Sequence, residues 1–264
     1  MKTNKENIVL KAKNLAIGYK TRKSEFRIGE TINFELSRGE LVGLVGANGI
    51  GKSTLIRTLT KVQPELDGLI EINNRSLKTF KPAELARALS VVLTESIASK
   101  NLTAYEIVAL GRQPYTNWIG SLNREDNSAI EHAVERSNIS DYKDKKGYEL
   151  SDGQLQKVMI ARALAQDTDL IILDEPTTHL DMYHKAYILT LLNSLAKETN
   201  KTILFSSHEI DLAIQLCDKI IIMNENEVLI DTPGNHIRDG NFSTLFSEDL
   251  IIFDATTGSF KVNK

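Results

Sequence analysis

The sequence lacks several features that mark common classes of protein. Its single cysteine, Cys217, excludes an internal disulfide and a metal site built from several cysteines. No stretch reaches the roughly 20 apolar residues that a membrane-spanning helix needs, and the polar start MKTNKENIVL lacks the apolar core of a signal peptide. We therefore expect a soluble globular protein of the cytoplasm.

The chain also lacks a large net charge of either sign. Its 32 Lys and Arg residues and 35 Asp and Glu residues give a formal net charge of -3 at pH 7. Such a balance provides no general attraction to nucleic acid or to anionic lipid. We expect no nucleic-acid partner, and any binding of phosphate has to come from a local site.

Two kinds of strand pattern are present. Short alternating segments from Ile8 to Leu36 are typical of antiparallel strands. Near-continuous apolar runs at Glu40–Gly46, Asp169–Pro176 and Thr202–His208 end in polar residues, as expected for parallel strands covered on both faces. After Asp218, the segment KIIIMNENEVLID predicts a closing hairpin.

Helical patterns separate these strands. The helices between about Thr103 and Ile139 have no strand between them, which predicts a helical subdomain inserted into an α/β core. With 41% hydrophobic residues, a chain of 264 residues can bury one core and a subdomain. The predicted helices are Lys52–Leu59, Pro82–Ala88, Ala104–Gly111, Asp126–Ser137, Asp152–Ala165 and Asp181–Thr199.

A glycine-rich segment, GANGIGKST, follows a predicted strand and opens a predicted helix. It fits the phosphate-loop pattern G-x-x-x-x-G-K-S, whose backbone amides surround the β-phosphate of a nucleotide. Lys52 would reach the β- and γ-phosphate oxygens, and Ser53 would bind Mg²⁺. An ordinary glycine-rich turn would lack this strand and helix context. The predicted nucleotide-binding residues are Gly46, Ala47, Asn48, Gly49, Ile50, Gly51, Lys52, Ser53 and Thr54.

A second acidic motif, LIILDEP, ends another predicted buried strand. Asp174 is placed to hold the Mg²⁺ shell. Glu175 follows it and can orient or deprotonate the attacking water. An acidic turn after a strand would look similar, but the coincidence with the phosphate loop favours a metal ligand and a general base.

With three further segments, these motifs resemble the ATP-binding cassette (ABC) ATPases. The further segments are LSDGQ at Leu150–Gln154, THLD at Thr178–Asp181 and SSH at Ser206–His208. The resemblance covers nearly the whole chain and implies an α/β fold, a P-loop NTPase core with an N-terminal antiparallel β subdomain and an inserted α-helical subdomain. It implies one domain over residues 1–264, with the core in about 1–95 and 167–240, the helical subdomain in about 96–166 and a C-terminal tail in about 241–264.

The resemblance also implies roles for residues outside the two motifs. Tyr19 would stack on adenine, although alone it would be read as a half-buried strand tyrosine. His208 would contact the γ-phosphate and act in catalysis with Glu175. Asp181 would lie at the interface between two copies, or serve only as a helix N-terminal acid. ATP and Mg²⁺ are the implied cofactors.

The stretch LSDGQ departs from the usual family pattern L-S-G-G-Q. In the family it binds the ATP held by the other subunit, so Ser151, Gly153, Gln154 and the helix amides would grip the γ-phosphate in trans. Asp152 replaces a glycine there. We expect its side chain to point away from the phosphate, so that the site is modified but still active.

Glu95 is a second departure, because the family places a glutamine where this strand ends. A carboxylate can still bind Mg²⁺ but lacks the donor of an amide. We expect Glu95 to be a metal ligand. The replacement of glutamine by glutamate should affect how the core is coupled to the helical subdomain.

The segment NLTAYEIVALGRQPYTNW, with Tyr115 in place of a common histidine, resembles the ATPases that drive import of iron chelates, haem and cobalamin. The leading interpretation is a homodimeric ATPase that energises uptake of an iron(III) chelate. It would work with membrane permease subunits and, indirectly, with a substrate-binding protein, at the cytoplasmic side of the bacterial inner membrane. The alternatives are import of haem or cobalamin, and a soluble ABC ATPase without a transport role. The ATPase does not touch the ligand, so its sequence does not select among these.

Overall fold

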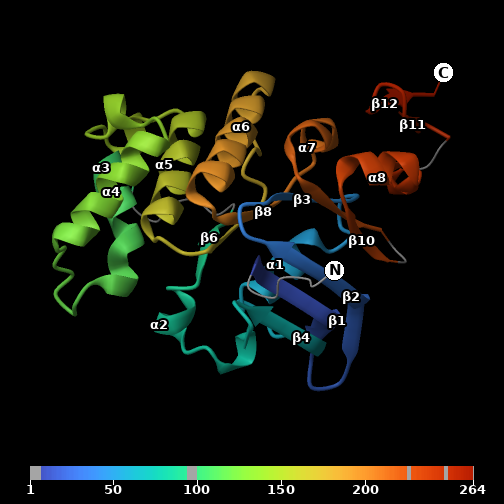
Figure 1. Cartoon of the computed structure of the whole chain (residues 1–264), viewed down its shortest axis with the longest axis horizontal. Coiled ribbons are helices and arrows are strands. Elements are labelled where there is room, and N and C mark those ends of the chain that lie inside the picture. The colour runs from blue at the N-terminus through green and yellow to red at the C-terminus, as the bar shows by residue number, and fades with distance from the viewer. Residues whose placement is uncertain (1–6, 94–99, 225–226, 247–248, 264) are drawn as a thin grey trace.

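Two β-sheets form the centre of the molecule (Figure 1). The computed structural model describes residues 7–93, 100–224, 227–246 and 249–263. Within these residues the first sheet has the strand order β2-β1-β4-β5, and its strands pair antiparallel. Its strands are β1 (Ile8–Lys20), β2 (Glu25–Ser37), β4 (Asp67–Ile72) and β5 (Arg75–Ser76).

The second sheet has the order β10-β9-β3-β8-β7-β6. All neighbours pair in parallel except β9 and β10, which form the antiparallel hairpin predicted after Asp218. The strands are β3 (Leu41–Val45), β6 (Leu89–Val92), β7 (Leu170–Leu173), β8 (Thr202–Ser206), β9 (Lys219–Met223) and β10 (Val228–Asp231).

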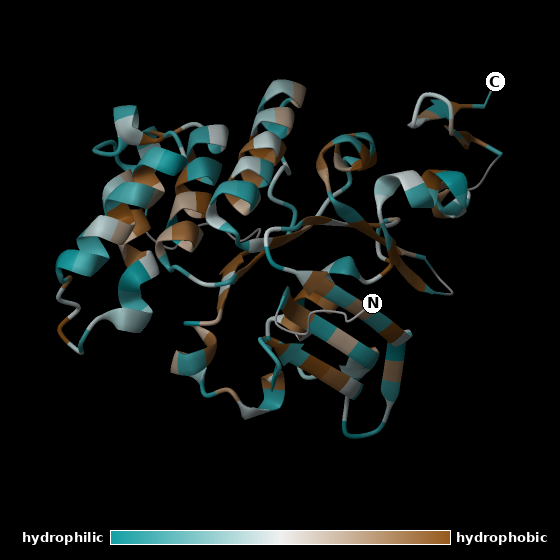
Figure 2. Cartoon of the chain, viewed as in Figure 1, coloured by the Kyte–Doolittle hydropathy of each residue, from teal (hydrophilic) through white to brown (hydrophobic). Residues whose placement is uncertain are grey.

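Alternate residues of the central strands enter two different hydrophobic cores. Val42 and Leu44 of β3 pack with the antiparallel sheet and helix α1 (Lys52–Leu59), whereas Leu41 and Val45 pack on the helical side. Figure 2 shows these strands as mostly hydrophobic, while the helices around them mix hydrophobic and hydrophilic residues. The prediction of parallel strands covered on both faces is confirmed.

Most of the remaining helices lie on one side of the six-stranded sheet or beyond its edges, whereas the first of them lies on the side of the antiparallel sheet (Figure 1). Of the described helices, none combines the length and the apolar character needed to cross a membrane. The helices other than α1 are α2 (Pro82–Leu85), α3 (Ala104–Ala109), α4 (Arg124–Arg136), α5 (Asp152–Ala165), α6 (Met182–Thr199), α7 (Ile210–Leu216) and α8 (Pro233–Arg238). The tail ends in a hairpin of β11 (Ile251–Asp254) and β12 (Ser259–Val262).

Several predicted helix boundaries need correction. The helix predicted from Asp126 starts two residues earlier, because the side chain of Asn123 accepts a hydrogen bond from the Asp126 amide and caps the helix. The helix predicted to end at Gly111 stops at Ala109 and continues as a 3₁₀ segment, Leu110–Tyr115. The helix predicted to run to Ala88 ends at Leu85.

A buried ion pair joins the 3₁₀ segment to α4. Arg112 Nε donates to Asp126 Oδ1 at 2.9 Å, and Arg112 also donates to the carbonyl of Ala165 at 2.9 Å. The two charged side chains are only 8% and 1% exposed. The pair therefore holds three helical segments together.

Arg112→Met should destabilise the protein strongly. The substitution leaves Asp126 buried without its cation, which typically costs about 3–5 kcal/mol. The matched control is Arg136→Met, which removes a well-exposed arginine paired with Glu198 and should cost less than about 1 kcal/mol. Urea unfolding of both variants measures the difference, and equal losses of stability would contradict the assignment.

Candidate functional site

The glycine-rich loop lies between β3 and α1, at the carboxyl end of the six-stranded sheet. Gly51 caps the helix with a φ of 112°, and a Cβ at this position would overlap the side chain of Ile28. Only glycine satisfies both conditions. The first amides of α1, which begins at Lys52, have no partner within the helix and can bind an anion.

Lys52 is buried, and its ammonium group is held by the loop itself. Its Nζ donates to the carbonyl oxygens of Gly46 and Ala47 at 2.9 and 3.0 Å. Burial lowers the pKa of Lys52, and the nearby carboxylates of Glu175 and Asp174 offset this only in part. A bound phosphate would supply a charged acceptor in place of two neutral carbonyl groups.

Asp174 follows β7 and is almost fully buried. The hydroxyl of Ser53 donates to its Oδ1 at 3.3 Å, so the two predicted metal ligands lie together. No group of three or more His, Cys, Asp or Glu side chains in the described part of the chain could hold a metal ion alone. Two oxygen ligands fit Mg²⁺, which keeps several waters and takes further oxygens from phosphates.

Glu175 has a strained backbone and a well-ordered carboxylate. Its φ of 49° lies in the left-handed region, which side chains disfavour. One carboxylate oxygen lies 2.8 Å from His208 Nε2, and the other accepts the hydroxyl of Thr178 at 3.0 Å. Burial raises the pKa of Glu175, but these hydrogen bonds outweigh it and lower the pKa overall. The side chain is therefore held ionised, as a base must be.

Ser206 is a functional residue that the sequence interpretation missed. It is fully buried at the end of β8, donates to Asp174 Oδ1 at 2.7 Å and accepts the amide of Glu175 at 2.8 Å. One hydroxyl therefore orients both acids. The signal for it in the sequence was a polar residue at the end of an apolar strand, in the segment SSH.

Tyr19 lies near the end of β1, next to α1. Its hydroxyl is 3.1 Å from Thr54 Oγ1, and 48% of the residue is exposed. The ring is thus anchored at its hydroxyl and open to solvent. The stacking of adenine on this ring stays a prediction.

The signature stretch forms the start of α5. Ser151 is the N-cap: its hydroxyl accepts the amide of Gln154 at 3.3 Å, and its own amide donates to Gln154 Oε1 at 3.0 Å. Asp152 is exposed and Gly153 is buried. No hydrogen bond between described residues connects this stretch to the loop at 46–54.

Asp181 is the N-cap of α6, where its side chain accepts the amide of His184 at 2.8 Å. It therefore serves as a helix N-terminal acid, one of its two predicted roles. Glu95 lies outside the described residues, and its role as a metal ligand stays a prediction.

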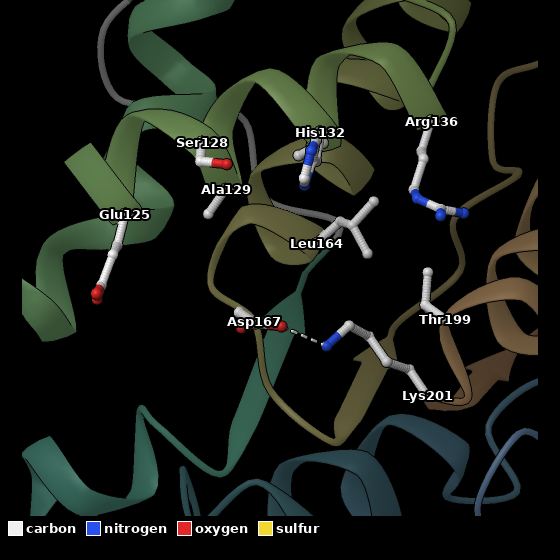
Figure 3. A pocket seen from close by; sticks show the side chains of 10 residues that line it. Glu125, Ser128, Ala129, His132, Arg136, Leu164, Asp167, Thr199 and Lys201 are labelled. Atoms are coloured by element: carbon white, nitrogen blue, oxygen red, sulfur yellow. Dashed lines mark hydrogen bonds and ion pairs between the residues drawn. The ribbon is translucent and has the colours of Figure 1, made fainter.

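A separate cavity of about 450 Å³ lies between α4, the end of α5 and residues 199–201 (Figure 3). None of its lining residues belongs to the loop or the acidic motif. Lys201 donates to Asp167 at 2.8 Å, and Arg136 donates to Glu198 at 2.7 Å. Each of these two cations is therefore paired with a carboxylate at the rim of the cavity.

Comparisons with known sequences relate the chain to one family. A family model described as ABC transporter matches residues 30–178. An uncharacterized ABC transporter ATP-binding protein of Methanocaldococcus jannaschii is 39% identical over 96% of this chain and 87% of its own length. The iron(3+)-hydroxamate import ATP-binding protein of Bacillus subtilis is 34% identical over 92% of this chain and 86% of its own.

Solved structures show the same fold. A putative metal-chelate type ABC transporter in an inward-facing conformation superposes with a TM-score of 0.77 at 27% identity, over 91% of this chain and 89% of that chain. A dimeric ATP-binding cassette bound to ADP and Pi superposes with a TM-score of 0.70 at 27% identity, over 85% of this chain and 98% of that one.

Ser206→Ala should lower both stability and the binding of ATP with Mg²⁺. The amide of Glu175 loses its buried partner, which costs about 1–3 kcal/mol, and Asp174 loses a donor that orients it. Chemical unfolding and calorimetric titration of ATP at several Mg²⁺ concentrations measure the two effects.

The matched control for this prediction is Ser90→Ala. Ser90 is equally buried, on β6, and its hydroxyl bonds to the Ala163 carbonyl and the Thr168 hydroxyl at 3.0 and 2.8 Å. We expect a similar loss of stability without a change in the Mg²⁺ requirement. The same Mg²⁺ requirement in both variants would show that Ser206 is only structural.

Proposed function

This chain is an ATPase of the ABC transporter family, and we propose that it powers uptake of an iron(III) chelate through a membrane permease. The observation that carries the proposal is the similarity to an iron(3+)-hydroxamate import ATP-binding protein over 92% of the chain. The superposition on a metal-chelate type transporter supports it. In this proposal the subunit works at the cytoplasmic face of the membrane.

Uptake measurements in a strain that lacks this subunit test the choice of ligand. We expect uptake of a labelled iron(III) hydroxamate to stop and uptake of labelled haem and cobalamin to continue. Restoration by the wild type but not by Lys52→Ala would tie the defect to nucleotide binding. Loss of haem or cobalamin uptake alone would assign the subunit to that ligand.

In the proposed mechanism, the loop at 46–54 holds the phosphates of ATP. The ammonium of Lys52 turns from the loop carbonyls to the β- and γ-phosphate oxygens. The half-exposed ring of Tyr19 provides a face for adenine. His208, which is hydrogen-bonded to Glu175, would contact the γ-phosphate.

Hydrolysis needs a water held in line with the γ-phosphate. Bound Mg²⁺ would neutralise phosphate charge at Ser53 and Asp174. Glu175 is held ionised and accepts the proton of the water. Thr178 and His208 fix the two oxygens of that carboxylate, so the base is oriented before ATP binds.

The site is incomplete in one chain, and a second copy would complete it. Ser151, Gly153 and Gln154 of one copy would contact the ATP held by Lys52 of the other. Asp181 would lie at the same interface. Closure of this homodimer would act on the permease subunits, and a substrate-binding protein would deliver the chelate on the opposite side of the membrane.

Glu175→Gln should bind ATP but hydrolyse it slowly, and it should accumulate as an ATP-bound dimer. The amide keeps the size of the side chain but cannot take up the proton, and loss of a positioned base typically costs about 10²–10⁴ in rate. Phosphate release and size-exclusion chromatography with ATP measure the two effects. Glu198→Gln, which changes an exposed acid on α6, is the control, and equal rates in the two variants would reassign the base.

A mixed dimer tests whether the site is shared. If one chain carries Lys52→Ala and the other carries Ser151→Arg, a shared arrangement puts both changes into one site and leaves the other site intact. We expect mixing of the two inactive variants to recover part of the ATPase activity. Verified mixed dimers without any activity would argue for a site built within each chain.

A further inference from the structure

The imidazole of His184 contacts Asp181 on one side. Its Nδ1 lies 2.9 Å from both carboxylate oxygens, while its backbone amide donates to Oδ1 at 2.8 Å. Because a carboxylate only accepts hydrogen bonds, Nδ1 carries the proton and donates it. The hydrogen bonds from the amide and the ring of His184 lower the pKa of Asp181.

The other side of the same ring covers Gly153 in the signature stretch. A Cβ built on Gly153 would lie 2.9 Å from Cδ2, 3.4 Å from Cγ and 3.5 Å from Nε2 of His184. Real Cβ atoms do not approach other atoms as closely as 2.9 Å, so the ring occupies the space that any larger residue would need. His184 thus lies between the first turns of α5 and α6.

We propose that His184 is a positioning residue that links Asp181 to the signature stretch of the same chain. This inference rests on the proposed function. The carboxylate of Asp181 orients the ring, and the ring fixes where the backbone of Gly153 can lie. The signature stretch and Asp181 then meet the partner copy as one unit. A shift of one segment would otherwise leave the other in place.

This contact also explains a glycine that helix formation alone would not select. Gly153 lies in the first turn of α5, where alanine has the higher helix propensity. An alanine at 153 would require the ring to shift, and that shift would weaken its bond to Asp181. Positions 153 and 184 are therefore coupled.

A double-mutant cycle on the nucleotide-free subunit tests the coupling without relying on any activity. The four proteins are wild type, Gly153→Ala, His184→Ala and the double variant. We expect Gly153→Ala to lower the thermal midpoint in the wild-type background and to leave it unchanged or higher with His184→Ala, where the ring is absent. Equal shifts of the midpoint in both backgrounds would overturn the contact.

ATP-driven dimerisation tests the positioning role. In the Glu175→Gln background, His184→Ala should raise the ATP concentration for half-maximal dimer formation by about tenfold, the equivalent of one lost hydrogen bond of about 1.4 kcal/mol. His184→Asn places an amide nitrogen near the position of Nδ1 and should keep the ATP requirement close to that of the Glu175→Gln protein. His184→Gln places it near Nε2 and should not. His132→Ala on α4 is the control.

The outcomes separate this inference from the proposed function. A Glu175→Gln protein that does not dimerise with ATP would count against the proposed function, and the thermal cycle would still decide the contact. Normal dimerisation of Glu175→Gln together with an unchanged ATP requirement in His184→Ala would overturn the positioning role. A similar defect in His184→Asn and His184→Gln would also overturn it, because only the first retains the bond to Asp181.

Discussion

The hydroxyl of Ser206 joins the end of β8 to the end of β7, and the arrangement of the site depends on this junction. Parallel strands bring their carboxyl ends to one edge of a sheet, and β8 lies between β3 and β7. The loop after β3 carries Lys52, and the segment after β7 carries Asp174 and Glu175. Because one buried hydroxyl bonds to the carboxylate of Asp174 and to the backbone amide of Glu175, the position of both residues is tied to β8.

Much of this arrangement could be predicted because it is local. The helices Lys52–Leu59 and Asp152–Ala165 have the predicted boundaries, since a glycine and a serine cap them in the sequence itself. The apolar runs of the central strands also predicted their burial on both faces. The family resemblance then related the separate motifs to one nucleotide, which spacing alone could not do.

What could not be predicted depends on contacts between distant segments. The hydroxyl of Ser206 meets Asp174 only because β7 and β8 are neighbours. The ring of His184 covers Gly153, which lies far away in the sequence, because the first turns of α5 and α6 meet at this point. The left-handed backbone of Glu175 is likewise imposed by its surroundings, since no local pattern favours glutamate in that conformation.

The self-contained hydrogen bonding of Lys52 has a consequence for the end of each reaction cycle. When the products leave, the ammonium can return to the carbonyls of Gly46 and Ala47, so no buried cation is left without acceptors. On departure of ADP, the ammonium would exchange phosphate oxygens for the carbonyl oxygens of the loop as its hydrogen-bond acceptors. The loop itself thus keeps this buried charge hydrogen-bonded while the site is empty, which favours release of the product.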